Sequence, residues 1–290
     1  MEPLINWKEL QFARLGRPAG GPGGAVDWSA MAAMYARMAE MEAEHTTYQV
    51  DAFPTDAADT VLDIGCGPGR ISIPMARRAA RVTAMDSASG MLDACRANVA
   101  AAGLDNVDYL QLDWHEAVAG ENVPLHDIVI CSRTVALSQL ERLSEFARKR
   151  VAVVMWANAP SIPPILDRIF EGAQDPQNSM RGHGSPDRRL AYNVLYNIVY
   201  DLGFEPNVVV VPDGFTRTFA TPEEEYDYLR VLRPMLPGAQ AEAAFRTNVD
   251  HFTTTNPDGS VTFLVTTRSV VLWWDVHPAS YEEVWPTHAH

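Results

Sequence analysis

One stretch in the first quarter of the chain carries the residue types that cradle a nucleotide. The apolar run Val61-Leu62-Asp63-Ile64 holds a single acid and leads at once into Gly65-Cys66-Gly67-Pro68-Gly69. An apolar run followed by alternating glycines and a helical pattern predicts a buried strand that turns tightly into a helix. The neighbouring residues then indicate which nucleotide such a turn would hold.

Two common nucleotide motifs fit this stretch poorly. The dinucleotide fingerprint G-x-G-x-x-G needs a third glycine for close packing of the helix on the strand, and Arg70 occupies that position here. The phosphate-binding P-loop also fails, because no Gly-Lys-Ser/Thr follows. A nicotinamide or flavin enzyme is therefore a distant alternative.

The same residues resemble motif I of the class I S-adenosylmethionine (SAM)-dependent methyltransferases. In that motif an acid on the first strand runs into G-x-G-x-G, and residues 63–69 match every position. The resemblance implies cofactor contacts at Asp63, Gly65, Cys66, Gly67 and Gly69. Asp63 has two roles open, binding of the SAM amino group through water or acceptance of backbone N–H bonds from the turn, and Cys66 serves only as a small loop residue.

Residues at the ends of the next two predicted strands extend the resemblance. Asp86 ends the second strand, where the family keeps an acid that accepts hydrogen bonds from both ribose hydroxyls, and Ser87 and Met91 then flank the adenine. After the third strand, Asp113 occupies the place of the family's acceptor for the adenine amino group. Trp114 either stacks on the adenine or packs at the sheet edge.

The residues after the predicted fourth strand bear on the acceptor. Ser132-Arg133-Thr134 does not match the Asn/Asp-Pro-Pro-Tyr typical of methyltransferases that act on exocyclic amines of bases. We assign Ser132 to the cofactor site. Arg133 either binds a substrate carboxylate or forms a salt bridge with an acid such as Glu116.

Methyl transfer from a sulfonium chiefly requires alignment of the nucleophile and exclusion of water. A general base is needed only when the acceptor is protonated at the working pH. His183, in a glycine-flanked loop over the predicted site, is the candidate base, and Arg133 is the other candidate catalytic residue. No histidine or cysteine spacing indicates a metal site.

Alternating strand and helix patterns from residue 59 onward predict parallel βαβ units. The expected fold is α/β, a doubly wound, mostly parallel seven-stranded sheet with helices on both faces. Aromatic and methionine residues recur at helical spacing over residues 27–49. That face either packs on the core or forms a lid in which Tyr35 closes over SAM.

This reading predicts four segments. Residues 1–55 form an N-terminal helical lid and residues 56–212 the SAM-binding core. Residues 213–260 form a helical cap inserted before the last strand, and residues 261–290 hold the closing strand or strands and a tail.

Charge and cysteine usage restrict the partners. The net charge of −14 would repel a nucleic-acid backbone, and no apolar run is long enough to span a bilayer. Three cysteines without C-x-x-C spacing, and no signal peptide, predict a cytoplasmic protein with reduced thiols. We expect a small-molecule acceptor, no nucleic acid, no membrane and, as an assembly, a homodimer.

The predicted function is therefore transfer of a methyl group from SAM to an O, N, S or C nucleophile of a small molecule, with S-adenosylhomocysteine as product. Methylation of RNA or protein is the alternative enzyme activity. A non-catalytic SAM-binding sensor or partner protein is the alternative outside enzymology.

Overall fold

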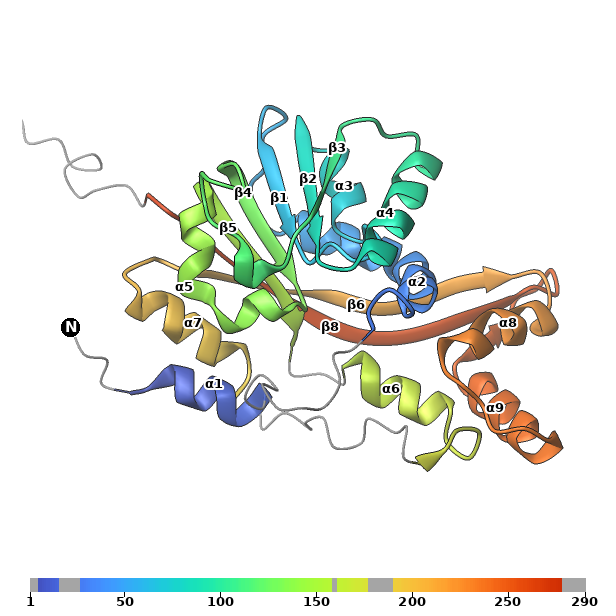
Figure 1. Cartoon of the computed structure of the whole chain (residues 1–290). Helices are drawn as coiled ribbons and strands as arrows, with labels where there is room; N and C mark the ends of the chain where they lie inside the picture. The colour runs from blue at the N-terminus through green and yellow to red at the C-terminus, as the bar shows by residue number, and fades with distance from the viewer. Residues whose placement is uncertain (1–4, 16–26, 158–160, 177–189, 278–290) are drawn as a thin grey trace, which may run out of the picture.

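The computed structural model describes residues 5–15, 27–157, 161–176 and 190–277 (Figure 1). Its strands are β1 (Thr60–Ile64), β2 (Arg81–Asp86), β3 (Val107–Gln111), β4 (His126–Ser132), β5 (Ala147–Trp156), β6 (Asn207–Phe219), β7 (Thr253–Thr255) and β8 (Val261–Asp275). Its α-helices are α1 (Trp7–Leu15), α2 (Ala32–Val50), α3 (Ser72–Ala76), α4 (Ser89–Ala101), α5 (Leu140–Leu143), α6 (Ile162–Ile169), α7 (Tyr192–Asp201), α8 (Pro222–Leu229) and α9 (Ala239–Asp250). Short 3-10 turns are η1 (Trp114–Glu116), η2 (Val135–Ser138), η3 (Ser144–Phe146) and η6 (Arg230–Leu232).

The strands form one mixed sheet in the order β3-β2-β1-β4-β5-β8-β6, and β7 adds to β8. Neighbours from β3 to β5 are parallel, whereas β8 is antiparallel to both β5 and β6. The order reverses at β1, so the carboxyl ends of β1 and β4 flank the switch point where ligands bind in such sheets. The predicted α/β class and mostly parallel sheet are confirmed.

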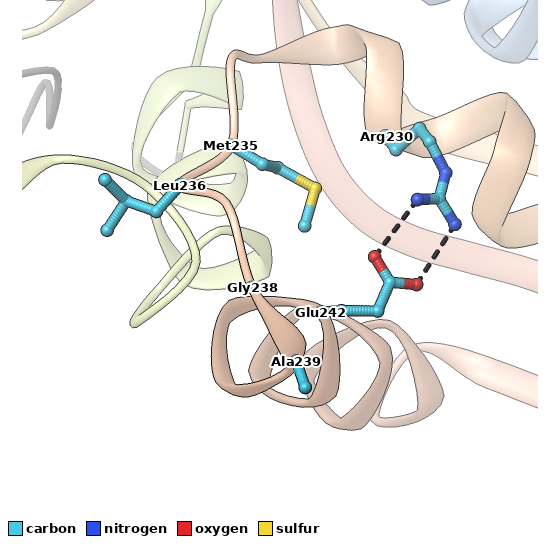
Figure 2. A pocket seen from close by; sticks show the side chains of 6 residues that line it. All are labelled: Arg230, Met235, Leu236, Gly238, Ala239 and Glu242. Atoms are coloured by element: carbon cyan, nitrogen blue, oxygen red, sulfur yellow. Dashed lines mark hydrogen bonds and ion pairs between the residues drawn. The ribbon is translucent and has the colours of Figure 1, made fainter.

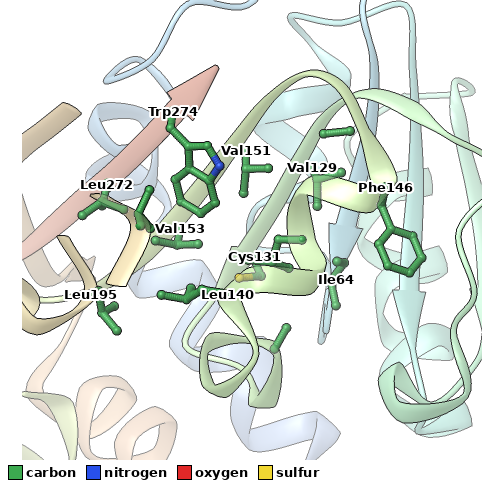
Figure 3. Close-up of a cluster of buried hydrophobic side chains, with 14 of the residues drawn as sticks. Ile64, Val129, Cys131, Leu140, Phe146, Val151, Val153, Leu195, Leu272 and Trp274 are labelled. Atoms are coloured by element: carbon green, nitrogen blue, oxygen red, sulfur yellow. The ribbon is translucent and has the colours of Figure 1, made fainter. Parts of the chain in front are cut away.

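Apolar strand residues cover both faces of this sheet, because a central parallel strand is buried on two sides. Leu62 and Ile64 of β1 point into one core with α5 and α7, and Val61 points into the other with α3 and α4. Figure 3 shows the first core, with Phe146 and Trp274 as the aromatic side chains among the labelled residues.

Beyond the sheet, β6 and β8 continue as a two-stranded arm. The antiparallel pairing of β6 with β8 covers all of Asn207–Phe219, whereas β8 pairs with β5 only from Ser269 to Asp275. Residues 212–219 and 261–268 therefore leave the sheet together, toward α8 and α9 in Figure 1. A third apolar core joins this arm to α6, α8, α9 and Met41 of α2.

Local pairing sets the length of three elements. The helix after the glycine turn is only α3, because the following turns lead Ala80 N–H to Asp59 O below β1. Between β4 and β5 the chain forms only short turns and α5, since pairing of Ala147 with His126 begins β5. Strand β6 continues to Phe219 because β8 pairs with it along its whole length.

Candidate functional site

The glycine turn lies at the carboxyl end of β1 and is held mainly by backbone. Gly65 and Cys66 donate N–H bonds to Met85 O at 2.8 and 3.0 Å, and Gly67 N–H donates to Asp86 Oδ2 at 2.9 Å. The φ angles of Gly65, Gly67 and Gly69 are +68°, +54° and +91°, a region that side chains disfavour. The three glycines are therefore required by the conformation of the turn.

Space around the glycines differs. A Cβ on Gly65 would lie 2.8 Å from the Thr134 Cβ, so only glycine lets the turn approach the residues after β4. At Gly67, nothing beyond its chain neighbours lies within 4 Å of a Cβ position among the described residues. The turn therefore presents an open face at Gly67.

Asp63 is fully buried and does not hold the turn. Its Oδ2 accepts the Ser72 hydroxyl at 2.6 Å, and Met85 O takes the turn N–H groups instead. Burial raises the pKa of Asp63 to about 6, against the opposing hydrogen bond from Ser72. Acceptance of the turn N–H bonds, one of its two predicted roles, is therefore wrong, and binding of the SAM amino group through water stays a prediction.

Asp86 ends β2 beside the turn. Its Oδ2 accepts Gly67 N–H and its Oδ1 accepts Ala88 N–H, each at 2.9 Å. A carboxylate has about four acceptor positions, so each oxygen keeps one for a further donor. Ser87, which follows it, is exposed, and Met91 in the first turn of α4 is buried.

The residues after β3 separate into an exposed acid and a buried ring. Asp113 caps η1 by accepting His115 N–H at 2.8 Å, and its side chain is 55% exposed. Trp114 is 3% exposed, with Phe146 5.1 Å away between ring centroids and the Arg142 guanidinium 4.4 Å from its ring. Trp114 is therefore packed in the core against Phe146 and Arg142, which favours its packing role over stacking on adenine.

The Arg133 guanidinium is paired within the protein, but not with Glu116. This corrects both predictions for it, binding of a substrate carboxylate and a salt bridge with Glu116. Its Nη1 lies 3.0 Å from Glu42 Oε1, and its Nη2 bonds Asp213 Oδ2. Its guanidinium also covers the Trp156 ring at 4.8 Å. Arg133 adopts a φ of +57°, which this set of contacts stabilises.

Arg70 completes a group of four charged side chains, the buried junction, which consists of Glu42, Arg70, Arg133 and Asp213. Arg70 Nε lies 3.3 Å from Glu42 Oε2, its Nη1 donates to Gln49 Oε1 at 2.7 Å, and its Nη2 donates to Ser132 Oγ. Glu42 and Asp213 are 1% and 0% exposed. Two acids and two arginines balance, so the junction has no net charge.

Sequence reasoning missed both acids of the junction. A signal for Glu42 exists, since Glu42, Thr46 and Gln49 form a polar stripe at helical spacing inside a methionine-rich helix, and all three are buried. Asp213 has no comparable local signal. Its partner Arg133 lies on a different element far away in the chain.

The remaining predicted residues fall in different places. Tyr35 lies on α2, with the Trp28 ring 6.1 Å away, and burial followed by the charge of Glu42 raises the pKa of its hydroxyl. Cys66 is buried, and a hydrogen bond with Cys95 followed by burial raises the pKa of its thiol. His183 lies outside the described residues.

A hollow of about 420 Å³ lies between η6 and α9, away from all the predicted site residues. Figure 2 shows Met235 beside it and Arg230 paired with Glu242 at 3.0 and 3.1 Å. Its two charged groups neutralise each other. Within the described ranges, no group of three potential metal ligands comes together, and no helix has the length and apolar content to cross a membrane.

The geometry at the ends of β1 and β2 agrees with the comparison to protein families. Residues 61–154, from β1 through most of β5, match the family model described as a methyltransferase domain. Residues 61–154 therefore form a methyltransferase domain of the class I, SAM-dependent type. SAM is its cofactor, and the open face at Gly67 together with the spare acceptor positions of Asp86 fits a ligand that carries a ribose.

Curated relatives match short segments of this chain. A ubiquinone biosynthesis O-methyltransferase of Stutzerimonas stutzeri is 38% identical over 28% of this chain and 34% of its own length. The 23S rRNA (uracil(1939)-C(5))-methyltransferase RlmD of Pseudomonas aeruginosa is 39% identical over 24% of this chain and 16% of its own. The matched segments thus span about a third or less of these relatives.

The fold of this methyltransferase also resembles that of solved structures. A chain from the complex of the Haloferax volcanii Trm112 methyltransferase activator with its methyltransferase superposes with a TM-score of 0.51. The two are 13% identical, and the match covers 88% of this chain and 98% of that one. At this identity the likeness concerns the fold.

Proposed function

We propose that this methyltransferase transfers the methyl group of SAM to an O, N, S or C nucleophile of a small molecule with apolar character. When bound, SAM supplies an activated methyl carbon: the acceptor's lone pair forms the new bond, the carbon–sulfur bond breaks, and its electron pair stays on sulfur in S-adenosylhomocysteine. A proton on the acceptor leaves to solvent or to a base.

The cofactor contacts that we propose lie on the glycine turn and the adjoining strand ends. Asp86 would accept the ribose hydroxyls at its two spare positions, and the open face at Gly67 would lie against the cofactor. Asp63 would act on the SAM amino group through water. Gly65, Cys66, Gly69, Ser87, Met91, Asp113, Ser132 and Tyr35 remain proposed contacts.

The observation that carries the small-molecule proposal is the neutrality of the buried junction. The arginines beside the site, Arg70 and Arg133, are paired with Glu42 and Asp213, so they offer no free positive charge to a phosphate. The chain as a whole has a net charge of −14. Both facts disfavour an RNA backbone, whose binding depends on unpaired cations.

An acceptor with apolar character has matching groups nearby. Met34 and Met38 of α2 and Trp156 of β5 border the same apolar core. The Trp156 indole N–H is buried and has no hydrogen-bond partner among the described residues. A buried donor of this kind can orient an acceptor oxygen.

The test measures release of S-adenosylhomocysteine by the full chain with two sets of acceptors. One set holds small aromatic and aliphatic alcohols, amines and thiols, and the other holds total bacterial RNA. We expect turnover with the first set only. Methylated RNA would overturn the proposal in favour of an RNA methyltransferase.

Calorimetry separates catalysis from binding alone. We expect SAM and S-adenosylhomocysteine to bind and NAD not to bind. SAM binding without turnover for any acceptor in either set would favour the non-catalytic SAM-binding protein.

A further inference from the structure

The outer edge of β6 is uncharged and open. β6 is the last strand of the sheet, and no strand of the described residues pairs with its outer side. Val208, Val209 and Val210 are 36%, 37% and 45% exposed, so neither helical layer covers them. Residues 207–211 carry no charge, whereas β3 at the opposite edge carries Asp108 in an ion pair with Arg81.

The pairing register shows which backbone groups face outward. Ala157 N–H donates to Arg268 O at 3.0 Å, so the polar backbone groups of Arg268 point toward β5. Arg268 is opposite Pro212, and in an antiparallel pair the backbone groups of Pro212 must therefore point away from β8. By alternation, Val208 and Val210 also face outward, while Val209 bonds β8.

Two prolines bracket this edge symmetrically. Pro206 and Pro212 lie at equal distances from Val209 in the sequence Pro-Asn-Val-Val-Val-Val-Pro. Because proline has no N–H, the outward donors between them are those of Val208 and Val210. The segment therefore reads almost the same in both directions.

We propose that two copies of the chain pair antiparallel through this edge, about a two-fold axis at Val209. Val208 of each copy exchanges both of its backbone hydrogen bonds with Val210 of the other copy. Val209 then lies opposite itself as a non-hydrogen-bonded pair, with Cβ atoms about 4.5–5.5 Å apart.

A second copy fits this edge for three reasons. The segment is self-complementary, as a two-fold interface requires. In this register the outward N–H groups of Val208 and Val210 all find acceptors, and Pro206 of each copy lies opposite Pro212 of the other. A shifted register would instead set a proline ring opposite Val208 or Val210. The edge itself carries no charged side chain, so two copies of this acidic chain do not repel each other there.

The pairing also brings together exposed apolar side chains, those of Val208, Val209 and Val210 in each copy. The two sheets would become one continuous sheet across the dimer.

The experiment uses sedimentation equilibrium on the full chain and two opposite variants of the residue on the axis. Wild type should be a dimer. Val209→Lys and Val209→Glu should each raise the dimer dissociation constant at least about 10-fold, because each places like charges face to face. An equimolar mixture of the two variants should recover the dimer, since only a residue on the two-fold axis meets its own counterpart.

A matched control is Leu264→Lys, which adds the same charge to a 49% exposed residue of β8 on the arm. This variant should keep the wild-type dissociation constant, and circular dichroism should show the same folded signal for all variants. A monomeric wild type, as expected if another strand of this chain or of a different protein covers the edge, would overturn the proposal. So would a dimer indifferent to both Val209 variants, or variants whose mixture stays monomeric.

Discussion

Two neighbouring regions at the carboxyl edge of the sheet are held by different kinds of interaction. The glycine turn after β1 is fixed by backbone N–H bonds to Met85 O and by one carboxylate, Asp86. The buried junction beyond β4 is fixed by side-chain charges, with Glu42 between two arginines. The turn therefore depends on conformation, and the junction depends on complete pairing.

This difference separates the duties of the two regions. A backbone-built turn leaves its open face free for a ligand, whereas the junction uses its charges internally to join α2, β4 and β6. A buried ion cluster contributes little net stability while intact, but loss of one member leaves an unpaired charge. Loss of one charged side chain at the junction should therefore destabilise the fold more than loss of one side chain at the turn.

The largest effect should follow from removal of Glu42. Glu42→Ala leaves Arg70 and Arg133 buried beside only Asp213, and should lower the free energy of unfolding by about 3–5 kcal/mol. Urea denaturation measures it. The matched control is Glu40→Ala on the same helix, whose 50% exposed side chain pairs with Arg217 and whose loss should cost about 1 kcal/mol or less. Similar losses for both variants would contradict the distinction.

Asp63 supplies a pH-dependent comparison on the turn side. Its folded pKa of about 6 lies above the ordinary value of 3.8 for an aspartate, so its contribution to stability falls as the pH rises from 3.8 through 6. Asp63→Asn lacks this titration. The free energy of unfolding of the variant relative to wild type should therefore rise by about 2.4 kcal/mol between pH 4 and pH 7. Parallel pH profiles would exclude a raised pKa.

Asp86 should matter for the cofactor more than for the fold. Asp86→Ala should weaken SAM binding by about 1.5–3 kcal/mol, the scale for hydrogen bonds to a charged acceptor. Calorimetry measures the affinity. Asp93→Ala removes an equally charged side chain, 73% exposed on α4, and should leave it unchanged. An Asp86 variant that binds SAM as wild type does would mean that another residue holds the ribose.

The smallest effect concerns the contact between the two regions. Gly65→Ala and Gly67→Ala both force a side chain into positive φ, but only at Gly65 does the new Cβ meet Thr134. Gly65→Ala should therefore cost about 1–2 kcal/mol more unfolding free energy than Gly67→Ala. Equal losses of stability for the two variants in thermal denaturation would show that the contact with Thr134 contributes nothing.

The two regions also differ in how far the sequence predicts them. Asp63, Gly65 and Gly67 lie within one short stretch, and strand ends bring Asp86 beside them by a general property of parallel sheets. The α/β class and the cofactor follow from such local patterns. The N-cap of α8 is equally local, since Thr221 Oγ1 accepts the N–H of Glu224, three residues further on.

The junction could not be predicted in this way. Glu42, Arg133 and Asp213 meet only because α2 crosses the sheet where β6 leaves it, and no spacing in the sequence encodes that crossing. Trp114 shows the same limit, since its position after β3 fits adenine stacking while tertiary packing places it against Phe146. For both Arg133 and Trp114 the sequence is compatible with more than one partner. Only the packing of the folded chain decides which partner each side chain contacts.

The buried cysteines make the cofactor turn observable. Cys66, Cys95 and Cys131 are the three thiols of the chain, all are buried, and the pKa values of the Cys66 and Cys131 thiols are raised. A thiol reagent in water reacts with exposed thiolates and so finds almost none in the folded chain. The rate at which Cys66 is alkylated therefore reports how often the turn opens spontaneously. A ligand that binds against Gly67 should lower this rate, and the measurement needs no mutation.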